Sequence, residues 1–225
     1  MKILVINPVG TSRYDKDDLQ YLTRKARKET ELEITSLSKG PEEITTFESQ
    51  VEICPEVLKI LKEKEYDAAI INCFANPCID AAKEVSEKPV VGPGEASLYL
   101  SLMLGDRISI ISPVDKTIPQ FSANVRKMGI ENRISSIRSV RIPVEALADD
   151  LRLTKSAIVR TARECIENDG ADVVVLGCTG MAYVADEVRE EIPVPVIEPL
   201  SAALGLAELW VQMKVAQSKY IIYKR

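Results

Sequence analysis

The stretch Ile70-Ile71-Asn72-Cys73-Phe74-Ala75-Asn76-Pro77 decides how this chain folds. It predicts a buried strand over 68–72 that stops at Cys73 and turns into a helix, with Asn76 as N-cap and Pro77 at the first helical position. Ligands bind at the carboxyl ends of strands in open α/β sheets. The positive end of a helix also favours a thiolate over a thiol. Cys73 is therefore predicted to lie where a ligand binds.

The same arrangement occurs a second time. The stretch Asp172-Val173-Val174-Val175-Leu176-Gly177-Cys178-Thr179-Gly180-Met181 predicts another strand that ends at a cysteine, 105 residues after the first, with Thr179 as a possible cap. Two further pairs match: Ile6-Asn7-Pro8-Val9 with Ile111-Ser112-Pro113-Val114 at the same offset, and Pro89-Val90-Val91-Gly92-Pro93 with Pro195-Val196-Ile197-Glu198-Pro199 at an offset of 106. Three matched pairs in one order indicate an internal duplication. The alternative is chance similarity, because Val/Ile strands followed by Pro or Gly are common in α/β proteins.

Strand and helix patterns alternate along the chain, and the strands are rich in Val and Ile. The predicted strands cover 2–6, 32–37, 68–72, 89–91, 107–111, 134–140, 173–176 and 194–197. A helix is predicted over 77–86 and another over 95–104. Thr154 is a candidate cap for a third, a last helix begins after Pro199, and 39–49 is expected to be a loop. This pattern predicts an α/β fold of two pseudo-symmetric lobes, each a parallel sheet flanked by helices. Gly92-Pro93-Gly94 is a break and a candidate hinge.

Composition excludes several classes of protein. The chain has 225 residues, enough for one large or two small domains, and a net charge of −5. No Lys/Arg run suggests nucleic-acid binding, and no apolar run reaches the length of a membrane span. The apolar segment at the start of the sequence is too short for a signal peptide, and the residues that flank it do not fit one. The protein is therefore expected to be cytoplasmic, with no nucleic-acid or membrane partner.

The sequence has five cysteines and no histidine. Without a secretory signal the cysteines are expected to be reduced. The absence of histidine excludes Cys–His catalytic pairs and Cys/His zinc sites, and it removes the usual general base. Proton transfer near neutral pH must then use Cys, Asp, Glu, Lys or Tyr. No metal is expected. The sequence has no glycine-rich phosphate loop, so no nucleotide cofactor is expected either.

The cysteines differ in their predicted settings. Cys165 lies on the apolar face of a helix and is expected in the core, whereas Cys54 and Cys78 sit at helix starts and are interpreted as structural. Cys73 and Cys178 end matched strands. They could be two buried cysteines in similar turns, or a disulfide. If the lobes are related by a pseudo-two-fold axis, the two thiols instead approach a ligand from opposite sides of the inter-lobe cleft. One could then remove a proton from a carbon while the other returns one to the opposite face.

Four motifs carry a family resemblance. They are Asn72-Cys73-Phe74-x-Asn76-Pro77, Leu176-Gly177-Cys178-Thr179-Gly180-Met181, Ile6-Asn7-Pro8 and Val90-Val91-Gly92-x-Gly94-Glu95-Ala96. Together they resemble the aspartate/glutamate/hydantoin racemase superfamily, and most of all its hydantoin racemases, over nearly the whole chain. The resemblance implies cofactor-independent racemisation with the active site in the inter-lobe cleft. It implies a first lobe of residues 1–93 and 207–225 and a second of 94–206.

The resemblance also implies roles for individual residues. Cys73 and Cys178 become the two acid/base residues. The implied substrate contacts are Asn7, Phe74, Ala75, Asn76, Ser112, Thr117, Thr179 and Gly180. Three positions depart from the hydantoin racemase pattern: Asn76-Pro77-Cys78 stands for Asp-Pro-Gly, the chain after Asn7-Pro8 differs, and Glu198 stands for Asp. Structural alternatives are a cap at Asn76, a turn residue at Asn7 and a helix cap at Thr117.

The leading hypothesis is a racemase acting on the carbon next to a carbonyl in 5-substituted hydantoins. Alternatives within the superfamily are an aspartate or glutamate racemase, an allantoin racemase, a decarboxylase and a maleate-type isomerase. A non-catalytic two-lobed protein that binds small molecules belongs to another class, and it would not explain two matched cysteines. A thiol-redox protein would be expected to carry a CxxC motif, which is missing. The expected partner is a small-molecule substrate, and a homo-oligomer is expected.

Overall fold

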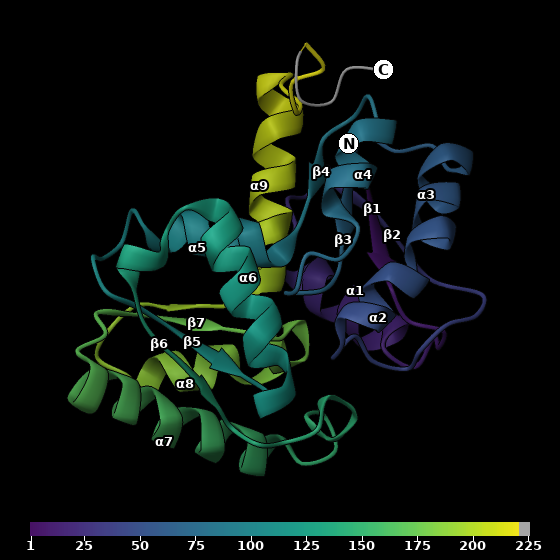
Figure 1. Ribbon diagram of the computed structural model, residues 1–225. Coiled ribbons are helices and arrows are strands. Elements are labelled where there is room, and N and C mark those ends of the chain that lie inside the picture. The colour runs from purple at the N-terminus through teal and green to yellow at the C-terminus, as the bar shows by residue number, and fades with distance from the viewer. Residues whose placement is uncertain (221–225) are drawn as a thin grey trace. The chain divides into compact units, whose positions relative to one another are not determined.

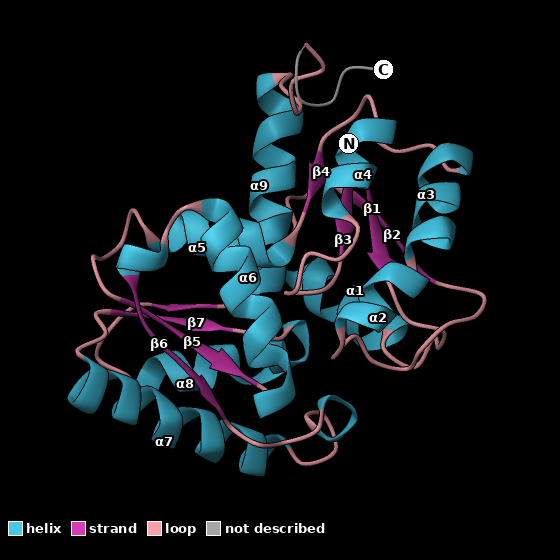
Figure 2. Ribbon diagram, viewed as in Figure 1, coloured by secondary structure: helices cyan, strands magenta, loops and turns pink. Residues whose placement is uncertain are grey.

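The computed structural model describes residues 1–220 and forms two compact units (Figure 1). The first unit contains Met1–Pro93 and the chain from Ala203 onward, and the second contains Gly94–Ala202. Within the described residues, each unit has a four-stranded parallel sheet, drawn in magenta among cyan helices in Figure 2. The predicted α/β fold with two lobes and parallel sheets is confirmed.

The first unit has the strand order β2-β1-β3-β4. Its strands are β1 (Lys2–Asn7), β2 (Glu31–Ser36), β3 (Ala68–Ile71) and β4 (Val90–Val91), and its helices are α1 (Asp15–Lys25), α2 (Phe47–Glu52), α3 (Cys54–Glu63) and α4 (Ile79–Val85). Alternate residues of the central strands, Leu4 and Ile6 of β1 and Ile71 of β3, share one core with Val57 of α3 and Ala82 of α4. The near-continuous apolar runs of β1 and β3 thus fit strands that are covered on both faces.

The second unit has the strand order β6-β5-β7-β8. Its strands are β5 (Ile108–Ser112), β6 (Ile134–Ser139), β7 (Val173–Leu176) and β8 (Val196–Ile197). Its helices are α5 (Pro93–Ser101), α6 (Ile118–Met128), α7 (Leu151–Asp169) and α8 (Ala185–Glu191), with 3₁₀ turns η1 (Asp115–Thr117), η2 (Glu131–Arg133), η3 (Val144–Ala146) and η4 (Thr179–Val184). Figure 1 shows α7 and α8 on one face of this sheet and α6 on the other. The last helix, α9 (Pro199–Met213), begins in this unit and passes into the first at Ala203.

The two sheets repeat each other in register as well as in order. Ile3 of β1 pairs with Ala68 of β3, and Ile108 of β5 pairs with Val173 of β7, so both residue numbers rise by 105 from one pair to the other. A chance likeness of short motifs would not be expected to conserve strand order and pairing register together. The structure therefore supports the internal duplication indicated by the sequence.

Glu208 anchors α9 on the first unit. Its carboxylate is almost fully buried and accepts hydrogen bonds from the Arg27 backbone N–H at 3.0 Å and the Thr30 hydroxyl at 2.6 Å. The Arg27 Nε atom lies 3.5 Å from the second carboxylate oxygen. These contacts hold the chain just after α1 against the last helix, and they supply the partners that a buried carboxylate requires.

The helix predicted over 77–86 begins later than expected. It starts at Ile79, so Asn76 is not its N-cap, and Pro77 precedes it. Asn76 and Cys78 take left-handed conformations with φ of 51° and 61°. The residue before a proline is disfavoured in the right-handed helical region, and Asn tolerates the left-handed one. The chain thus makes an extra turn between Cys73 and the helix.

Other helix starts also differ from the sequence prediction. Asp150, not Thr154, caps α7, accepting from the backbone N–H groups of Arg152 and Leu153 at 3.0 Å each. Thr179 begins a 3₁₀ turn that has no side-chain cap. The segment 39–49, predicted as a loop, already contains the start of α2, where Thr46 and Ser49 form a capping box. The side-chain caps at Thr46 and Asp150 therefore differ from those predicted at Thr154 and Thr179.

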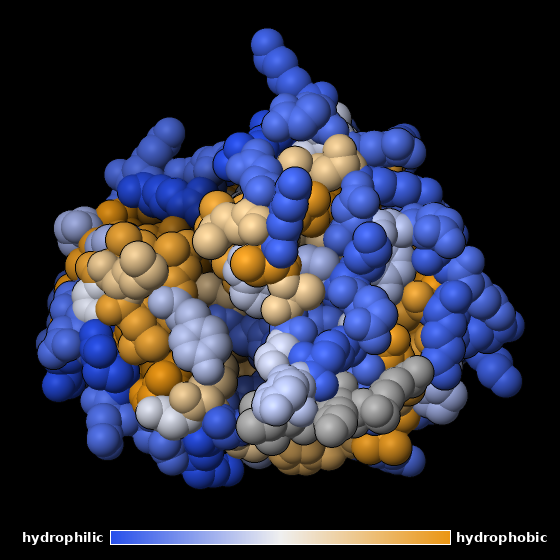
Figure 3. Space-filling view, turned by 90° about the horizontal axis from the view of Figure 1, so that it is seen from above, coloured by the Kyte–Doolittle hydropathy of each residue, from blue (hydrophilic) through white to orange (hydrophobic). Residues whose placement is uncertain are grey.

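Apolar side chains remain exposed on α5 and in the turn after it, among them Tyr99, Leu100, Met103 and Leu104. Figure 1 draws α5 in its left half. Figure 3, seen from above, shows orange apolar surface in its left half as well. Of the helices in residues 1–220, none combines the length and the apolar composition that a membrane span requires.

Candidate active site

Cys73 and Cys178 occupy equivalent positions in the two units. Each lies two residues beyond the third strand of its unit, Cys73 after β3 and Cys178 after β7. Both thiols are half-buried, and each packs against the core of its own unit. Each of these strands lies between two neighbours in its sheet, so each cysteine stands at the middle of a carboxyl edge. The structure therefore places both cysteines at the edge where α/β sheets bind ligands.

A network of carboxylates and amides lies beside Cys73. Asn7, the last residue of β1, donates from Nδ2 to Asp15 Oδ1 at 2.7 Å and to Asp18 Oδ2 at 3.0 Å. Asn72 donates from Nδ2 to Asn7 Oδ1 at 2.7 Å and to Asp18 Oδ2 at 3.2 Å. Ser36, at the end of β2, donates to Asp15 Oδ1 at 2.6 Å. The first turn of α1 thus ties together the carboxyl ends of three strands.

The predicted substrate contact Asn7 lies inside this network. Both of its amide hydrogens and its carbonyl oxygen bind protein groups, and 3% of the residue is exposed. It therefore organises the strand ends, and its contact with substrate stays a prediction.

The turn after Cys73 is compact. The Asn76 backbone N–H donates to the Cys73 carbonyl oxygen at 3.0 Å, and the side chains of Phe74 and Ala75 are buried. A Cβ added at Gly92 would lie 2.3 Å from Asn76 Oδ1, so the Asn76 side chain sits directly on the glycine backbone. A larger residue at position 92 would therefore displace the Asn76 side chain. The structure brings Asn76, Phe74 and Ala75 into one turn with Cys73.

The matching strand end of the second unit is built from hydroxyl groups. Ser112, the last residue of β5, and Thr117 have their hydroxyl oxygens in contact, and these oxygens lie 3.0 and 2.9 Å from the Val114 carbonyl oxygen, so the two hydroxyl hydrogens are shared among these three oxygens. Both residues are buried. Thr117 stands at the N-cap position of α6, as the structural alternative had it, but its side chain makes no cap hydrogen bond to the helix. The pair instead closes the loop that follows β5.

Cys178 directly precedes the 3₁₀ turn η4. The Gly177 backbone N–H donates to the Ile111 carbonyl oxygen at 2.7 Å, which fixes the chain just before the cysteine. The thiol lies 3.6 Å from the position that a Cβ at Gly180 would take, so it folds back over the turn. The first N–H groups of a helical turn have no partner within it. The Thr179 and Gly180 N–H groups, on half-buried residues, therefore give Cys178 neighbouring hydrogen-bond donors.

The other cysteines are placed differently. Cys165 is fully buried in the core of the second unit, as predicted, and burial raises the pKa of its thiol. Burial also raises the pKa of the Cys78 thiol, and the neighbouring Cys54 raises it further. Both effects keep these groups as neutral thiols near pH 7. All five cysteines lie in the described residues, and none is in a disulfide, so a Cys73–Cys178 disulfide is not part of this structure.

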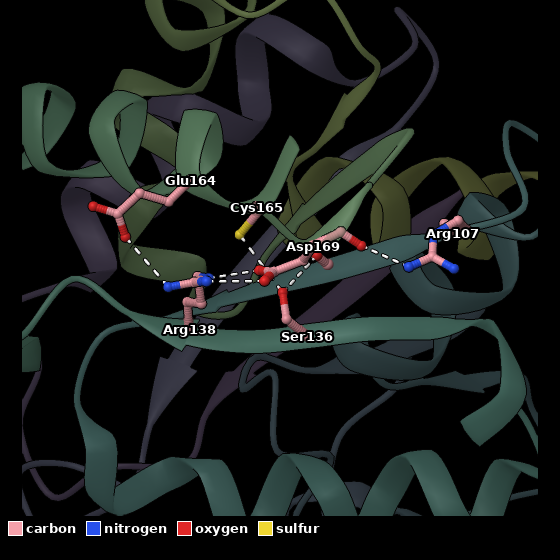
Figure 4. Close-up of polar contacts among 7 residues, drawn as sticks. Arg107, Ser136, Arg138, Glu164, Cys165 and Asp169 are labelled. Carbon is pink, nitrogen blue, oxygen red and sulfur yellow. Dashed lines mark hydrogen bonds and ion pairs between the residues drawn. The ribbon is translucent and has the colours of Figure 1, made fainter. Parts of the chain in front are cut away.

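A charged cluster around Cys165 lies on β6, the end of α7 and Arg107, the residue before β5 (Figure 4). Arg138 binds the Asp169 carboxylate with Nε at 2.6 Å and Nη2 at 2.9 Å, and this guanidinium lowers the Asp169 pKa to about 2. Arg107 donates to the carbonyl oxygens of Asp169 and Gly170 at 2.6 and 2.9 Å. Arg107 thus caps the end of α7 at the amino edge of the sheet, opposite the edge that carries Cys178.

Comparisons with known proteins identify the family. The model of the Asp/Glu/hydantoin racemase family matches residues 3–207. This chain belongs to that family. It is 32% identical to a hydantoin racemase of Paenarthrobacter aurescens, over all of this chain and 97% of the relative. It is also 32% identical to a hydantoin racemase of Pseudomonas sp. (strain NS671), over all of this chain and 91% of the relative.

A solved structure extends the similarity. The allantoin racemase from Klebsiella pneumoniae superposes with a TM-score of 0.94 at 27% identity, covering 99% of this chain and 92% of that one. The family and its hydantoin racemases make this chain an isomerase, a racemase, as the sequence motifs predicted.

Asp18 and Asn72 were not predicted as site residues. The sequence places Asp15, Asp17 and Asp18 in the first turn of a helix, where its dipole favours acidic groups. Asp18 is instead buried, and it lies four residues before the buried Leu22. That spacing puts an acid on the apolar face of α1, and it was the available signal that Asp18 has a partner inside the protein.

Proposed function

We propose that this racemase acts on 5-substituted hydantoins, without a cofactor, through two cysteines that serve as opposed acid and base. The observation that carries the proposal is the matched placement of Cys73 and Cys178, each two residues beyond the third strand of sheets with the same order and register. The two hydantoin racemases at 32% identity support this substrate class.

The proposed reaction inverts the ring carbon C5 in two proton transfers. In one direction the thiolate of one cysteine removes the C5 proton, and the electron pair moves onto the adjacent C4 carbonyl oxygen. The thiol of the other cysteine then delivers its proton to the opposite face of C5. In the reverse direction the two cysteines exchange roles. Each turnover leaves one thiolate and one thiol, so no oxidant or cofactor is consumed.

The negative charge that develops on the carbonyl oxygen needs hydrogen-bond donors. The N–H groups of Thr179 and Gly180 at the start of η4 lie beside Cys178 and suit this role. Asn7, Phe74, Ala75 and Asn76 in the first unit and Ser112 and Thr117 in the second remain the proposed substrate contacts. The side chains of Asn7, Ser112 and Thr117 also bind protein groups, so they hold the strand ends in shape in addition to their proposed contact with the substrate.

Allantoin is the second candidate substrate. The allantoin racemase from Klebsiella pneumoniae has the same fold over 99% of this chain. Allantoin is itself a hydantoin with a ureido group on C5, so the same two-base chemistry applies to it. The two candidates differ in what the site must accommodate at C5, an alkyl or aryl side chain against a polar ureido group.

Circular dichroism of enantiopure substrates tests the proposal. Separate solutions of L- and D-5-benzylhydantoin, 5-methylhydantoin, allantoin, aspartate and glutamate are followed over time with the enzyme. We expect the signal of the hydantoins to decay to zero faster than in buffer. Decay confined to allantoin would support the second candidate. Decay confined to the amino acids, or no decay in any solution, would contradict the proposal.

We also propose a homo-oligomer that functions in the cytoplasm. The exposed side chains of Tyr99, Leu100, Met103 and Leu104 form the kind of apolar surface that protein contacts cover. Five thiols suit a reducing compartment. Light scattering of the purified protein should give more than one chain per particle, and Met103→Glu should lower that mass. A monomeric wild-type protein would rule out the oligomer.

A further inference from the structure

The side-chain carbonyl oxygen of Asn72, the residue before Cys73, is a buried hydrogen-bond acceptor. The residue is 7% exposed, and its Oδ1 atom has no hydrogen-bond partner among residues 1–220. A buried polar atom without a partner costs free energy, so such atoms are rare in folded proteins. An acceptor left in this way, on the residue that precedes a proposed catalytic cysteine, indicates a donor that comes with the ligand.

The orientation of this oxygen is fixed by its own amide group. The Asn72 Nδ2 atom donates to Asn7 Oδ1 at 2.7 Å and to Asp18 Oδ2 at 3.2 Å. Both partners are acceptors, so an amide rotated by 180° would set oxygen against oxygen. Asp18 also accepts from Asn7 at 3.0 Å, which holds Asn7 Oδ1 toward Asn72. The network therefore permits one orientation of the Asn72 carboxamide, with its oxygen directed away from Asn7 and Asp18.

We propose that Asn72 Oδ1 accepts a hydrogen bond from the N–H group on the nitrogen bonded to the reacting carbon of the substrate, and that Asp18 and Asn7 are positioning residues for it. The inference rests on the proposed function and names the part of the ring that is recognised. Asn72 directly precedes Cys73, so the ligand group nearest to it is one attached to the carbon whose proton Cys73 removes. In a hydantoin that group is the N1–H.

This contact would contribute specificity for the substrate class. A carboxylate or carbonyl oxygen placed there would face Asn72 Oδ1 with no hydrogen between them, whereas an N–H group pairs with it. A site that hydrogen-bonds a ligand N–H discriminates strongly against analogues that lack it, because its own buried polar group is then left unpaired. Methylation of N1 should therefore be penalised at this position, and methylation of N3, on the other side of the C2 carbonyl, should not.

Calorimetric binding of hydantoin, 1-methylhydantoin and 3-methylhydantoin tests the inference. For the wild-type enzyme we expect 1-methylhydantoin to bind about tenfold or more weakly than 3-methylhydantoin. Asn72→Leu keeps a similar volume and removes the acceptor, so the ratio of the two affinities should fall by about tenfold. Taking the ratio cancels any general loosening of the fold. Asp18→Asn should reduce the same ratio, because the Asn72 amide is then no longer held in one orientation.

Ser36→Ala is the matched control. It removes a hydrogen bond to Asp15 in the same network without touching Asn72, and the affinity ratio should stay at the wild-type value. An unchanged ratio in Asn72→Leu overturns the inference, as does a wild-type enzyme that binds none of the three ligands. The proposed function fails separately, if the wild-type enzyme binds hydantoin but does not exchange its C5 protons in D₂O.

Discussion

The side-chain amide of Asn72 donates a hydrogen bond to the side-chain oxygen of Asn7 at 2.7 Å, so the ends of the adjacent strands β3 and β1 are joined by their side chains. The equivalent of Asn7 in the second unit is Ser112, the last residue of β5, which binds Thr117 and the Val114 carbonyl oxygen. The two units therefore share topology and register but differ in chemistry at the strand ends. One end is lined by amides and carboxylates and the other by hydroxyl groups.

Replacement of either proposed base should stop racemisation and leave half of the chemistry. With Cys73→Ser, the thiolate of Cys178 can still remove the α-proton from one enantiomer and return solvent deuterium to the same face. Cys178→Ser should exchange the other enantiomer. Racemisation should fall by about 10²–10⁴-fold in each variant, the usual contribution of a general acid or base. Proton NMR in D₂O with each pure enantiomer measures exchange, and circular dichroism measures racemisation.

Cys54→Ser serves as a control for cysteine substitution, because the Cys54 thiol donates to the Gln50 carbonyl oxygen, a bond that serine can replace. It should racemise at close to the wild-type rate. Exchange of the same enantiomer by both Cys73→Ser and Cys178→Ser would show that the two thiols are not opposed bases.

The positions of the two cysteines could be predicted because they depend on local patterns. A short run of buried Val, Ile or Ala followed by a polar turn marks a strand end, and a repeat at one spacing marks the equivalent strand end. The backbone after Cys73 could not be predicted in the same way. The dipeptide Asn76-Pro77 indicates that the Asn76 backbone avoids the right-handed helical conformation. It does not indicate that Asn76 and Cys78 both adopt the left-handed conformation.

The partners of Asn72 depend on tertiary structure. Asn72 meets Asn7 and Asp18, which lie 65 and 54 residues away in the chain, because β1 and β3 are neighbours in the sheet and α1 follows β1. Strand order is needed before such a contact can be proposed, and the sequence pattern predicts parallel strands without giving their order. Amphipathic periodicity alone would place Asp18 correctly on the inner face of α1, but it would not name its partners.

Gly177→Ala should damage both stability and turnover. A Cβ at this position would lie 2.7 Å from the Ile111 carbonyl oxygen and 2.8 Å from a ring carbon of Phe121. Both neighbours belong to the core, so the chain before Cys178 must shift and its thiol with it. We expect a destabilisation of about 1–3 kcal/mol, as for overpacked cores, and a lower kcat. Thermal unfolding and racemisation rates measure the two effects.

Gly205→Ala is the matched control for that substitution. Gly205 is an exposed position inside α9, and a Cβ there meets nothing within 4 Å. Alanine should stabilise the helix by about 0.5–1 kcal/mol and leave kcat unchanged. If Gly177→Ala also left kcat unchanged and did not destabilise the protein, the close approach at Gly177 would be unimportant for turnover and stability.

Turnover should not depend on a metal ion or on pyridoxal phosphate. The chain has no histidine, and the proposed proton transfers need two thiols and backbone N–H groups. Activity should therefore survive dialysis against EDTA and treatment with hydroxylamine, which strips pyridoxal phosphate from proteins. The racemisation rate before and after each treatment is the measurement. A loss on chelation that a metal salt restores would show that a bound ion takes part in the reaction.

The ion pair between Arg138 and Asp169 should make the stability of the second unit depend on acid pH. Arg138 lowers the Asp169 pKa from 3.8 to about 2 in the folded protein. A carboxyl whose pKa is depressed by folding stabilises the native state above its unfolded pKa. That stability is lost as the pH falls from about 4 to about 2. The contribution at pH 7 should be about 1–2 kcal/mol, because Arg138 is one-third exposed and water screens the pair.

Asp169→Asn isolates this contribution. The variant should unfold at a lower urea concentration than the wild type at pH 7, and the difference should shrink steadily between pH 4 and pH 2, where the wild-type carboxyl becomes protonated. Arg107 binds the backbone carbonyl oxygens of Asp169 and Gly170, so the end of α7 stays capped in the variant and its helix content should not change. Urea titrations followed by circular dichroism at several pH values give both quantities. A stability difference that is constant across this pH range would mean that the Asp169 charge does not stabilise the fold. The pair with Arg138 would then only position the two side chains.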